Sequence, residues 1–174
     1  MRKYFKLILL IVLVKTSVSA QNDLRQYKAG HVFNIGLPTY MTRTIGFNSS
    51  SSIEYENKVK DVFGFVIFDS KEELTIANIN YSSINEYYED FIKDFLKDEK
   101  KRKISKLVST KKGEINFIEC DASYFDDEAK TEIYYLVGLV ETKNSYYKVL
   151  SWCTLENKDK FKADFQKILY SLND

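Results

Sequence analysis

The stretch that decides the fold runs over residues 115–154 and reads INFIECDASY, FDDEA, KTEIYYLVGLVE, TKN and SYYKVLSWCT. Three of these pieces are long and rich in β-branched and aromatic residues, a composition typical of strands. The sequence therefore predicts strands at Ile115–Tyr124, Lys130–Glu141 and Ser145–Thr154. The pieces between them are polar and short enough for hairpin turns. We therefore expect an antiparallel meander of three strands.

The expected hairpins also place the two cysteines of the chain, Cys120 and Cys153. If both turns close directly at their flanking residues, Cys120 lies opposite Tyr134 and Cys153 lies opposite Ile133. The two cysteines then sit at one height on either side of the middle strand. Two strand spacings amount to about 9.6 Å, beyond the limit of about 7 Å between the Cα atoms of a disulfide. We therefore expect two free, buried thiols.

Further strands and two helices flank the meander. Val62–Phe68 is nearly continuous in strand-forming residues, and we expect Leu74–Ile79 to be its antiparallel neighbour. Apolar residues at helical spacing predict a helix over Ile84–Leu96, which a Ser-x-x-Glu capping box starts at Ser83. A closing helix is predicted up to Leu172, with Asn157 as its cap. These elements predict the α+β class, with a mostly antiparallel sheet flanked by helices.

Residues 1–20 have the three parts of a secretory signal peptide. A basic start is followed by the apolar run Leu7–Val14 and by small residues up to Ala20, after which we expect cleavage. The apolar run is too short for a membrane-spanning helix, which needs about 20 residues. We therefore expect an exported protein, periplasmic or secreted, whose residues 21–174 form a single α+β domain.

The predicted cleavage changes the charge of the protein. The leader carries four basic residues and no acidic one, so the mature chain keeps 22 Lys and Arg against 25 Asp and Glu, a net charge of −3. Phosphate binding needs a concentrated positive field, so we expect no nucleic-acid partner. The 13 Tyr and 12 Phe residues, with a single Pro, suit a packed domain.

Two short segments resemble a known family. Phe33–Pro38 (FNIGLP) is similar to the Phe-x-Ile-x-Leu-Pro segment that begins many PsbP-like proteins, and Phe165–Leu172 (FQKILYSL) also looks like that family. The resemblance extends over about residues 30–172 and agrees with the order of the expected elements. It implies a PsbP-like α-β-α sandwich and a role in binding or assembly. It transfers no contact residue, because these motifs describe packing and fold does not specify function.

The residues that could carry catalysis or hold a metal are few and separated. His31 is the only histidine and has no acidic or thiol neighbour in the sequence. Glu119 and Asp121 flank Cys120, but alternation along a strand points them to the opposite face. The acidic turn Asp126–Glu128 lacks EF-hand spacing, so we expect a solvated turn, with calcium binding as the alternative. We therefore expect no enzyme activity, no metal site and no cofactor.

Three pairs of adjacent tyrosines are the candidate residues for contact with a ligand or partner. They are Tyr87, Tyr88, Tyr134, Tyr135, Tyr146 and Tyr147. Each strand pair must present one ring to each side of the sheet. Tyrosine is enriched at binding surfaces, although rings that bridge sheet and helix in the core are the alternative. Gly138, in the middle strand, allows a ring or ligand to approach the backbone closely.

A basic segment, Lys97–Lys112, follows the first predicted helix. It could contact anionic lipid head groups at a membrane surface or an acidic partner. The alternative is an ordinary solvated surface, because Asp98 and Glu99 dilute the positive charge.

These observations favour a non-catalytic, exported binding or assembly domain that docks a protein partner in the cell envelope or outside it. The alternative is a carrier of a small apolar molecule, held in a Tyr/Phe-lined cavity between the sheet and a helix. An exposed aromatic patch would support docking, and an enclosed apolar pocket would support the carrier.

Overall fold

The computed structural model describes residues 24–30 and 32–174, so the predicted signal peptide and His31 lie outside the described residues. The elements, in chain order, are β1 Leu24–Ala29, β2 Phe33–Pro38, β3 Thr42–Thr44, β4 Ser51–Asn57, β5 Val62–Ser70, α1 Lys71–Ile76, α2 Ile84–Asp94, β6 Lys100–Ile104, β7 Val108–Lys112, β8 Ile115–Asp126, β9 Thr131–Glu141, β10 Ser145–Thr154, a 3-10 turn at Leu155–Asn157, and α3 Lys158–Ser171.

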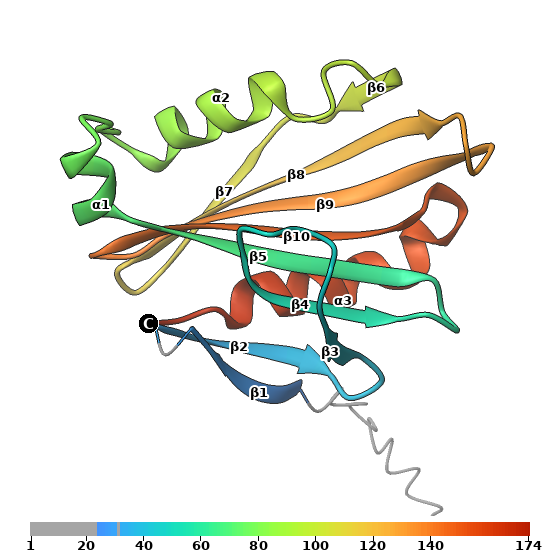
Figure 1. Ribbon diagram of the computed structural model, residues 1–174, viewed down its shortest axis with the longest axis horizontal. Helices are drawn as coiled ribbons and strands as arrows, with labels where there is room; N and C mark the ends of the chain where they lie inside the picture. Colours follow the sequence, from blue (N-terminus) through green and yellow to red (C-terminus); the bar gives the residue numbers. More distant parts are fainter. Residues whose placement is uncertain (1–23, 31) are drawn as a thin grey trace, which may run out of the picture.

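One antiparallel sheet of eight strands forms the centre of the molecule. Its order is β3-β4-β5-β10-β9-β8-β6, and β7 also pairs with β8. The helix α2 lies on one face of this sheet, and α3 with the β1–β2 hairpin lies on the other (Figure 1). The expected α+β architecture, a mostly antiparallel sheet flanked by helices, is confirmed.

The predicted meander is present as β8, β9 and β10, with strand ends within two residues of those expected. Its register differs from the expected one. The β8–β9 turn is shorter than the turn expected between the flanking residues, and the β9–β10 pairing is shifted by one residue. Cys153 pairs with Tyr134, and Cys120 pairs with Val137. The expected common height was therefore wrong. Both thiols are free and buried as expected, but they lie in the cores on opposite faces of the sheet.

The strand predicted at Leu74–Ile79 is wrong. Lys71–Ile76 forms the short helix α1, because the Ser70 hydroxyl accepts a hydrogen bond from the N–H of Glu73 and acidic residues occupy the first turn. The neighbours of β5 are instead β4 and β10. A helix start can outweigh the alternating apolar pattern of a short segment, since strand propensity depends strongly on context.

Both main helices match their predicted positions with small differences at the ends. The hydroxyl of Ser83 caps α2, and the side chain of Arg102 donates to the carbonyls of Ile92 and Phe95 where α2 ends. Asn157 precedes α3, but its amide donates to Thr154 and does not cap the helix, so that expectation was wrong.

Two glycines on the α3 side of the sheet are covered closely by neighbouring side chains. A Cβ atom at Gly138 of β9 would lie 2.4 Å from a methyl carbon of Leu169, which is fully buried. A Cβ at Gly64 of β5 would meet the ring of Tyr55 at 2.3 Å. Gly138 therefore allows a close approach, as the sequence suggested, and the side chain that approaches comes from α3.

The residues after α3 close the fold on its earliest strands. The backbone of Asn173 exchanges two hydrogen bonds with Asn34 of β2, at 2.7 and 3.1 Å. The carboxylate of Asp174 accepts from the hydroxyls of Thr142 (2.6 Å) and Tyr147 (3.0 Å), at the β9–β10 end of the sheet.

Replacing Gly138 with Ala should lower the free energy of unfolding by about 1–3 kcal/mol, because the added methyl group overpacks the α3 contact. For a domain of this size that corresponds to roughly 2–4 °C in Tm for each kcal/mol. Thermal unfolding followed by circular dichroism measures it. The matched test is the double variant Gly138→Ala/Leu169→Ala, whose loss should be smaller than the sum of the two single losses. Additive losses would contradict the proposed contact.

Candidate functional site

The α2 side of the sheet carries a cluster of partly exposed aromatic side chains around Trp152. Trp152 lies on β10 opposite Phe63 of β5 and Tyr135 of β9, and its ring stacks on theirs at centroid distances of 5.6 and 5.5 Å. Phe65 meets the same ring edge-on at 5.7 Å. Phe47, from the loop between β3 and β4, joins at 5.4 Å. We call Phe47, Phe63, Phe65, Tyr135 and Trp152 the aromatic face.

The aromatic face is open because α2 leaves most of it uncovered. The helix packs on β8 and β9, and Phe95, in the segment that follows it, lies 5.4 Å from the ring of Tyr135. In Figure 1 the β3–β4 loop crosses in front of β5 and β10. Within that loop Phe47 is 38% exposed and Ile45 is 92% exposed. The other four rings of the face are partly buried.

A buried carboxylate on β4, that of Glu54, holds the β3–β4 loop against the sheet. It accepts hydrogen bonds from the backbone N–H groups of Phe47 (2.9 Å) and Asn48 (2.7 Å) and from the hydroxyl of Ser51 (2.7 Å). Burial disfavours the charged form, but these hydrogen bonds outweigh it and hold the pKa of Glu54 below its ordinary value. The ionised carboxylate thus fixes Phe47 on the aromatic face.

A second aromatic group joins three tyrosines at the opposite end of α2. The ring of Tyr87 stacks on Tyr146 of β10 at 4.5 Å, and Tyr81 meets both rings edge-on. The hydroxyl of Tyr87 donates to Asp69 at 2.5 Å, and Asp69 also pairs with Lys148. Burial, together with the charge of Asp69, raises the pKa of Tyr87 far above its ordinary value. Tyr87 is therefore a permanently neutral donor.

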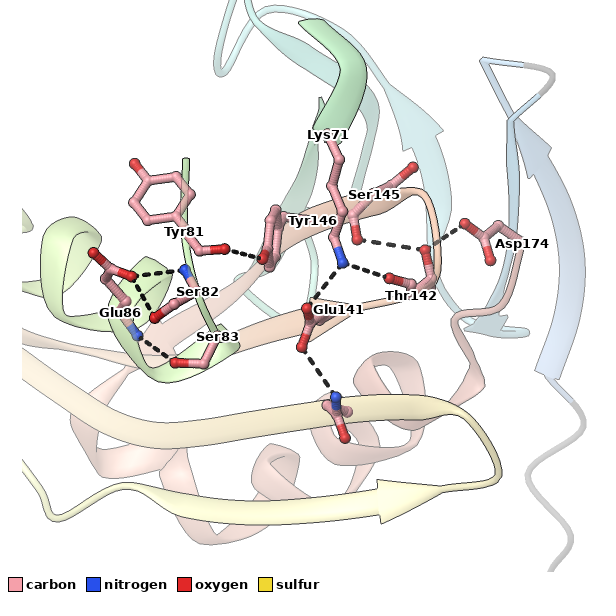
Figure 2. Close-up of polar contacts among 11 residues, drawn as sticks. Lys71, Tyr81, Ser82, Ser83, Glu86, Glu141, Thr142, Ser145, Tyr146 and Asp174 are labelled. Carbon is pink, nitrogen blue, oxygen red and sulfur yellow. Dashed lines mark hydrogen bonds and ion pairs between the residues drawn. The ribbon is translucent and has the colours of Figure 1, made fainter. Parts of the chain in front are cut away.

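Lys71 lies beside Tyr146, as Figure 2 shows. Its ammonium lies 4.6 Å from the centroid of the Tyr146 ring and donates to Glu141 (2.9 Å) and to the carbonyl of Thr142 (3.0 Å). Burial disfavours ionisation of Glu141, but the hydrogen bonds from Lys71 and Asn116 keep its pKa below the ordinary value. Both charges are engaged within the protein, so the group stabilises the end of the sheet.

The six tyrosines identified from the sequence divide between the two faces of the sheet. Those on the α2 side are Tyr87, Tyr88, Tyr135 and Tyr146, and those on the α3 side are Tyr134 and Tyr147. Each strand pair thus presents one ring to each side. All of them except Tyr135 are at most 4% exposed. Tyr135 is the member that reaches the aromatic face, and a role of the other five in binding stays a prediction.

The cysteines lie in surroundings that suppress their reactivity. Cys120 lies against Tyr88 on the α2 side, whereas Glu119 and Asp121 bond to residues of α3 on the other side. Burial raises the pKa of Cys120 to about 11 and that of Cys153 to about 12, so both remain protonated thiols. Within residues 24–30 and 32–174, no group of three or more His, Cys, Asp or Glu side chains is placed to hold a metal ion.

The acidic turn makes its contacts within the protein. The carboxylate of Asp126 accepts from the backbone N–H groups of Glu128 and Ala129, at 2.8 and 2.9 Å. Asp127 pairs with Lys100 at 2.5 Å. Among the described residues no ligand set for a metal ion is present at this turn. Calcium binding there stays an alternative.

The basic segment is partly engaged in the same way. Lys97 pairs with Asp94 at 2.9 Å, Lys100 pairs with the acidic turn, and Arg102 contacts the end of α2. Residues 100–104 form the strand β6. Contact of Lys97–Lys112 with a membrane surface stays a prediction. Among the described residues, no helix has the length and apolar character needed to cross a membrane.

The hollows found in the described part of the chain lie at its surface. One of about 490 Å³ lies beside α3, between Leu24 and Lys112, and one of about 400 Å³ lies along the β3–β4 loop. The space between α2 and the sheet, where a carrier would hold its ligand, is filled by buried side chains, including those of Ile92, Ile118 and Leu139.

The sequence analysis overlooked four of the five residues of the aromatic face. A signal for part of it exists, because Phe63 and Phe65 alternate along β5 with Val62, Gly64 and Val66 and so share one side of the strand. Phe47 and Trp152 are distant from them in the sequence, and only the tertiary fold brings them together.

Comparison with known proteins identifies the fold. No family profile and no curated protein matches the sequence. Among solved structures, the chain is similar to cyanobacterial PsbP (CyanoP) from Synechocystis sp. PCC 6803, with TM-score 0.63, 10% identity, and coverage of 92% of this chain and 98% of that one. LpqN, which is involved in cell envelope biogenesis of Mycobacterium tuberculosis, matches with TM-score 0.57, 7% identity, and coverage of 81% and 82%. PA94 of Pseudomonas aeruginosa, a protein of unknown function, matches with TM-score 0.53, 7% identity, and coverage of 87% and 97%.

These likenesses show the fold alone. The resemblance read from Phe33–Pro38 and Phe165–Leu172 is thereby confirmed, and the chain has a PsbP-like fold. Phe33–Pro38 is β2, which packs on α3, and Phe165–Leu172 runs through the second half of that helix to the residue after it.

Replacing Glu54 with Gln should release the β3–β4 loop, because a neutral amide offers one acceptor oxygen to three donors. We expect a loss of about 1–3 kcal/mol in unfolding free energy and greater quenching of the single tryptophan, Trp152, by acrylamide. Glu114→Gln, an exposed glutamate in the β7–β8 turn, is the matched control and should change neither quantity.

The effect of Glu54→Gln should depend on pH. Since the folded-state pKa of Glu54 is lowered, its stabilisation is fully present above the unfolded-state pKa of about 4.3 and is lost as the pH falls through the folded-state value. The two proteins should therefore differ in Tm at pH 7 and converge in strong acid. A difference that is constant down to low pH would argue against an ionised anchor.

Proposed function

We propose that this PsbP-like domain is a non-catalytic docking domain that works after export and holds a protein partner on the aromatic face. The single observation that carries the proposal is the contiguous, partly exposed cluster of five aromatic rings around Trp152. Tryptophan, tyrosine and other aromatic residues are enriched among the residues that dominate binding energy at protein interfaces.

The position of the aromatic face supports this function. Three of its residues lie on β5 and β10, and a fourth lies on β9, in the middle of the sheet. Strands in the middle of a sheet hold side chains rigidly, which reduces the entropy lost on binding. The tight α3 contact and the polar network around Lys71 and Asp69 hold the same strands from the other face and from the other end.

Two further observations agree with a role in the cell envelope. Residues 1–20 have the pattern of a signal peptide. One structure with the same fold, LpqN, is described as involved in cell envelope biogenesis. Identity of 7% transfers no partner from that protein, so the proposal names none.

Association with a partner in the host cell tests the proposal. The exported chain carries a C-terminal tag, is cross-linked in the cell, and the proteins bound to it are quantified by mass spectrometry. Trp152→Ala and Phe47→Ala should each reduce recovery of the main partner at least roughly tenfold, as expected for interface residues worth over 1.4 kcal/mol. Val108→Ala, at an exposed apolar position on β7, should leave recovery unchanged.

Folding of each variant is checked by its circular dichroism spectrum and Tm. Phe47 lies in a surface loop, so Phe47→Ala separates loss of contact from loss of fold. Equal recovery of the same partner with wild type and with both folded variants would overturn the proposal.

A further inference from the structure

We propose that the edge strand β7 binds an extended, acidic segment of a protein partner, which adds to the central sheet as a further strand. The site is separate from the aromatic face, because β8 lies between β7 and the strands that carry that face. It goes beyond the docking function proposed above and does not depend on it.

The turn between β7 and β8 fixes which main-chain groups of β7 are unpaired. Two residues form this turn, so Lys112 and Ile115, which flank it, exchange both of their main-chain hydrogen bonds. Bonded and non-bonded pairs alternate along an antiparallel ladder, so the N–H and C=O groups of Lys111 and Ser109 point away from β8. Within residues 24–30 and 32–174 these groups have no main-chain partner. An unpaired edge of this kind is a template for another strand.

Strand β7 is open to solvent along most of its length. Four of its five residues are exposed, with Val108 at 53%, and only Thr110 is half-buried. The helix α2 packs mainly on β8 and β9. A hollow of about 350 Å³ lies between β7, at Ser109 and Lys111, and the start of α2 at Ile84. Side chains of an added strand therefore have room beside β7.

The sequence around this edge is strongly basic. From residue 100 to residue 116, seven residues are Lys or Arg and one, Glu114, is acidic. Lys106, Lys111 and Lys112 are exposed, and none of the three forms an ion pair within the described part of the chain. The edge therefore presents positive charge to the solvent.

The carboxylates of β8 are engaged on the α3 side of the sheet. Asp121 pairs with two lysines of α3, both at 2.9 Å. Glu119 is 7% exposed and accepts a hydrogen bond from Gln166 of α3 at 2.7 Å. Lys111 projects to the opposite side, because it lies three residues along the strand from Val108, the residue that pairs with Glu119. The positive charge of Lys111 is thus left for a partner.

Charge selects the strand that fits this edge. Lysine opposes the pairing of two copies of β7, because like charges directly opposite each other destabilise a ladder. An acidic strand has the opposite effect, since carboxylates at alternate positions lie opposite Lys111 and towards the hollow at the start of α2. Main-chain hydrogen bonds then supply affinity, and the charges supply specificity.

Solution NMR with blocked octapeptides tests the inference. The two probes alternate Glu with Thr and Lys with Thr, because threonine favours the extended conformation. Saturating Glu–Thr peptide should slow the solvent exchange of the Ser109 and Lys111 amides at least roughly tenfold, since both N–H groups become hydrogen-bonded. It should also bind at least roughly tenfold more tightly than the Lys–Thr peptide, and this preference should shrink between low salt and about 150 mM salt.

Two pairs of variants separate strand addition from a general attraction between charges. Ser109→Pro removes an outward N–H group at an edge position where proline is tolerated, and it should weaken binding of the Glu–Thr peptide at least roughly fivefold. Ser109→Ala keeps the N–H group and should bind as the wild type does. Lys111→Gln should weaken binding several-fold, whereas Lys160→Gln, the same change of charge at an exposed position on α3, should not. Circular dichroism and Tm check the fold of each variant.

Equal affinity for the two peptides, no binding of either peptide, or binding that leaves exchange of the Ser109 and Lys111 amides unchanged would overturn strand addition. Vesicles of phosphatidylcholine with phosphatidylglycerol are the third probe. If they bind the protein and the Glu–Thr peptide does not, the basic edge serves a membrane surface and the acidic strand is rejected. Amide exchange in the wild-type protein decides the question even if Ser109→Pro does not fold.

Discussion

The contact between Leu169 and the bare backbone of Gly138 is the constraint on which the rest of the structure depends. It brings α3 so close to β9 that no side chain fits between them. The β1–β2 hairpin packs beside α3 and completes the cover of that face. The other face is covered by α2, by residues of α1 and of the segment after α2, and by the β3–β4 loop. The aromatic face lies on β5, β10 and β9, beside the strands on which α2 packs.

Much of the fold could be predicted from the sequence, because long periodic segments specify their own structure. Ile115–Thr154 shows the three strands, and the apolar spacing after Ser83 shows α2. The errors occur where local signals compete or where geometry depends on a turn. Leu74–Ile79 is apolar enough for a strand, but the cap at Ser70 starts a helix. The register of Cys120 changed by three residues because the turn before β9 is tighter than its polar length suggests.

The candidate site was harder to predict from the sequence than the fold, for a physical reason. The tyrosine pairs are conspicuous in the sequence, yet five of the six rings serve the interior, since hydroxyl groups such as that of Tyr87 find hydrogen-bond partners within the protein. Exposure of a ring depends on which elements lie above it. Phe47, Phe63 and Trp152 come from three separate segments, and only the tertiary fold brings their rings together.

The pairing of Asn173 with Asn34 joins residues 139 positions apart and has a consequence for the order of events during synthesis. Strand β2 lies near the start of the described chain, but its inner edge is completed by α3 and the residues after it. Contacts of such long range are slow to form, because most of the loop must close before they contribute. Because the chain is synthesised from its N-terminus, this core cannot be completed before α3 and the residues after it have been made. If the chain is exported, as we propose, that delay keeps it unfolded until α3 has been synthesised.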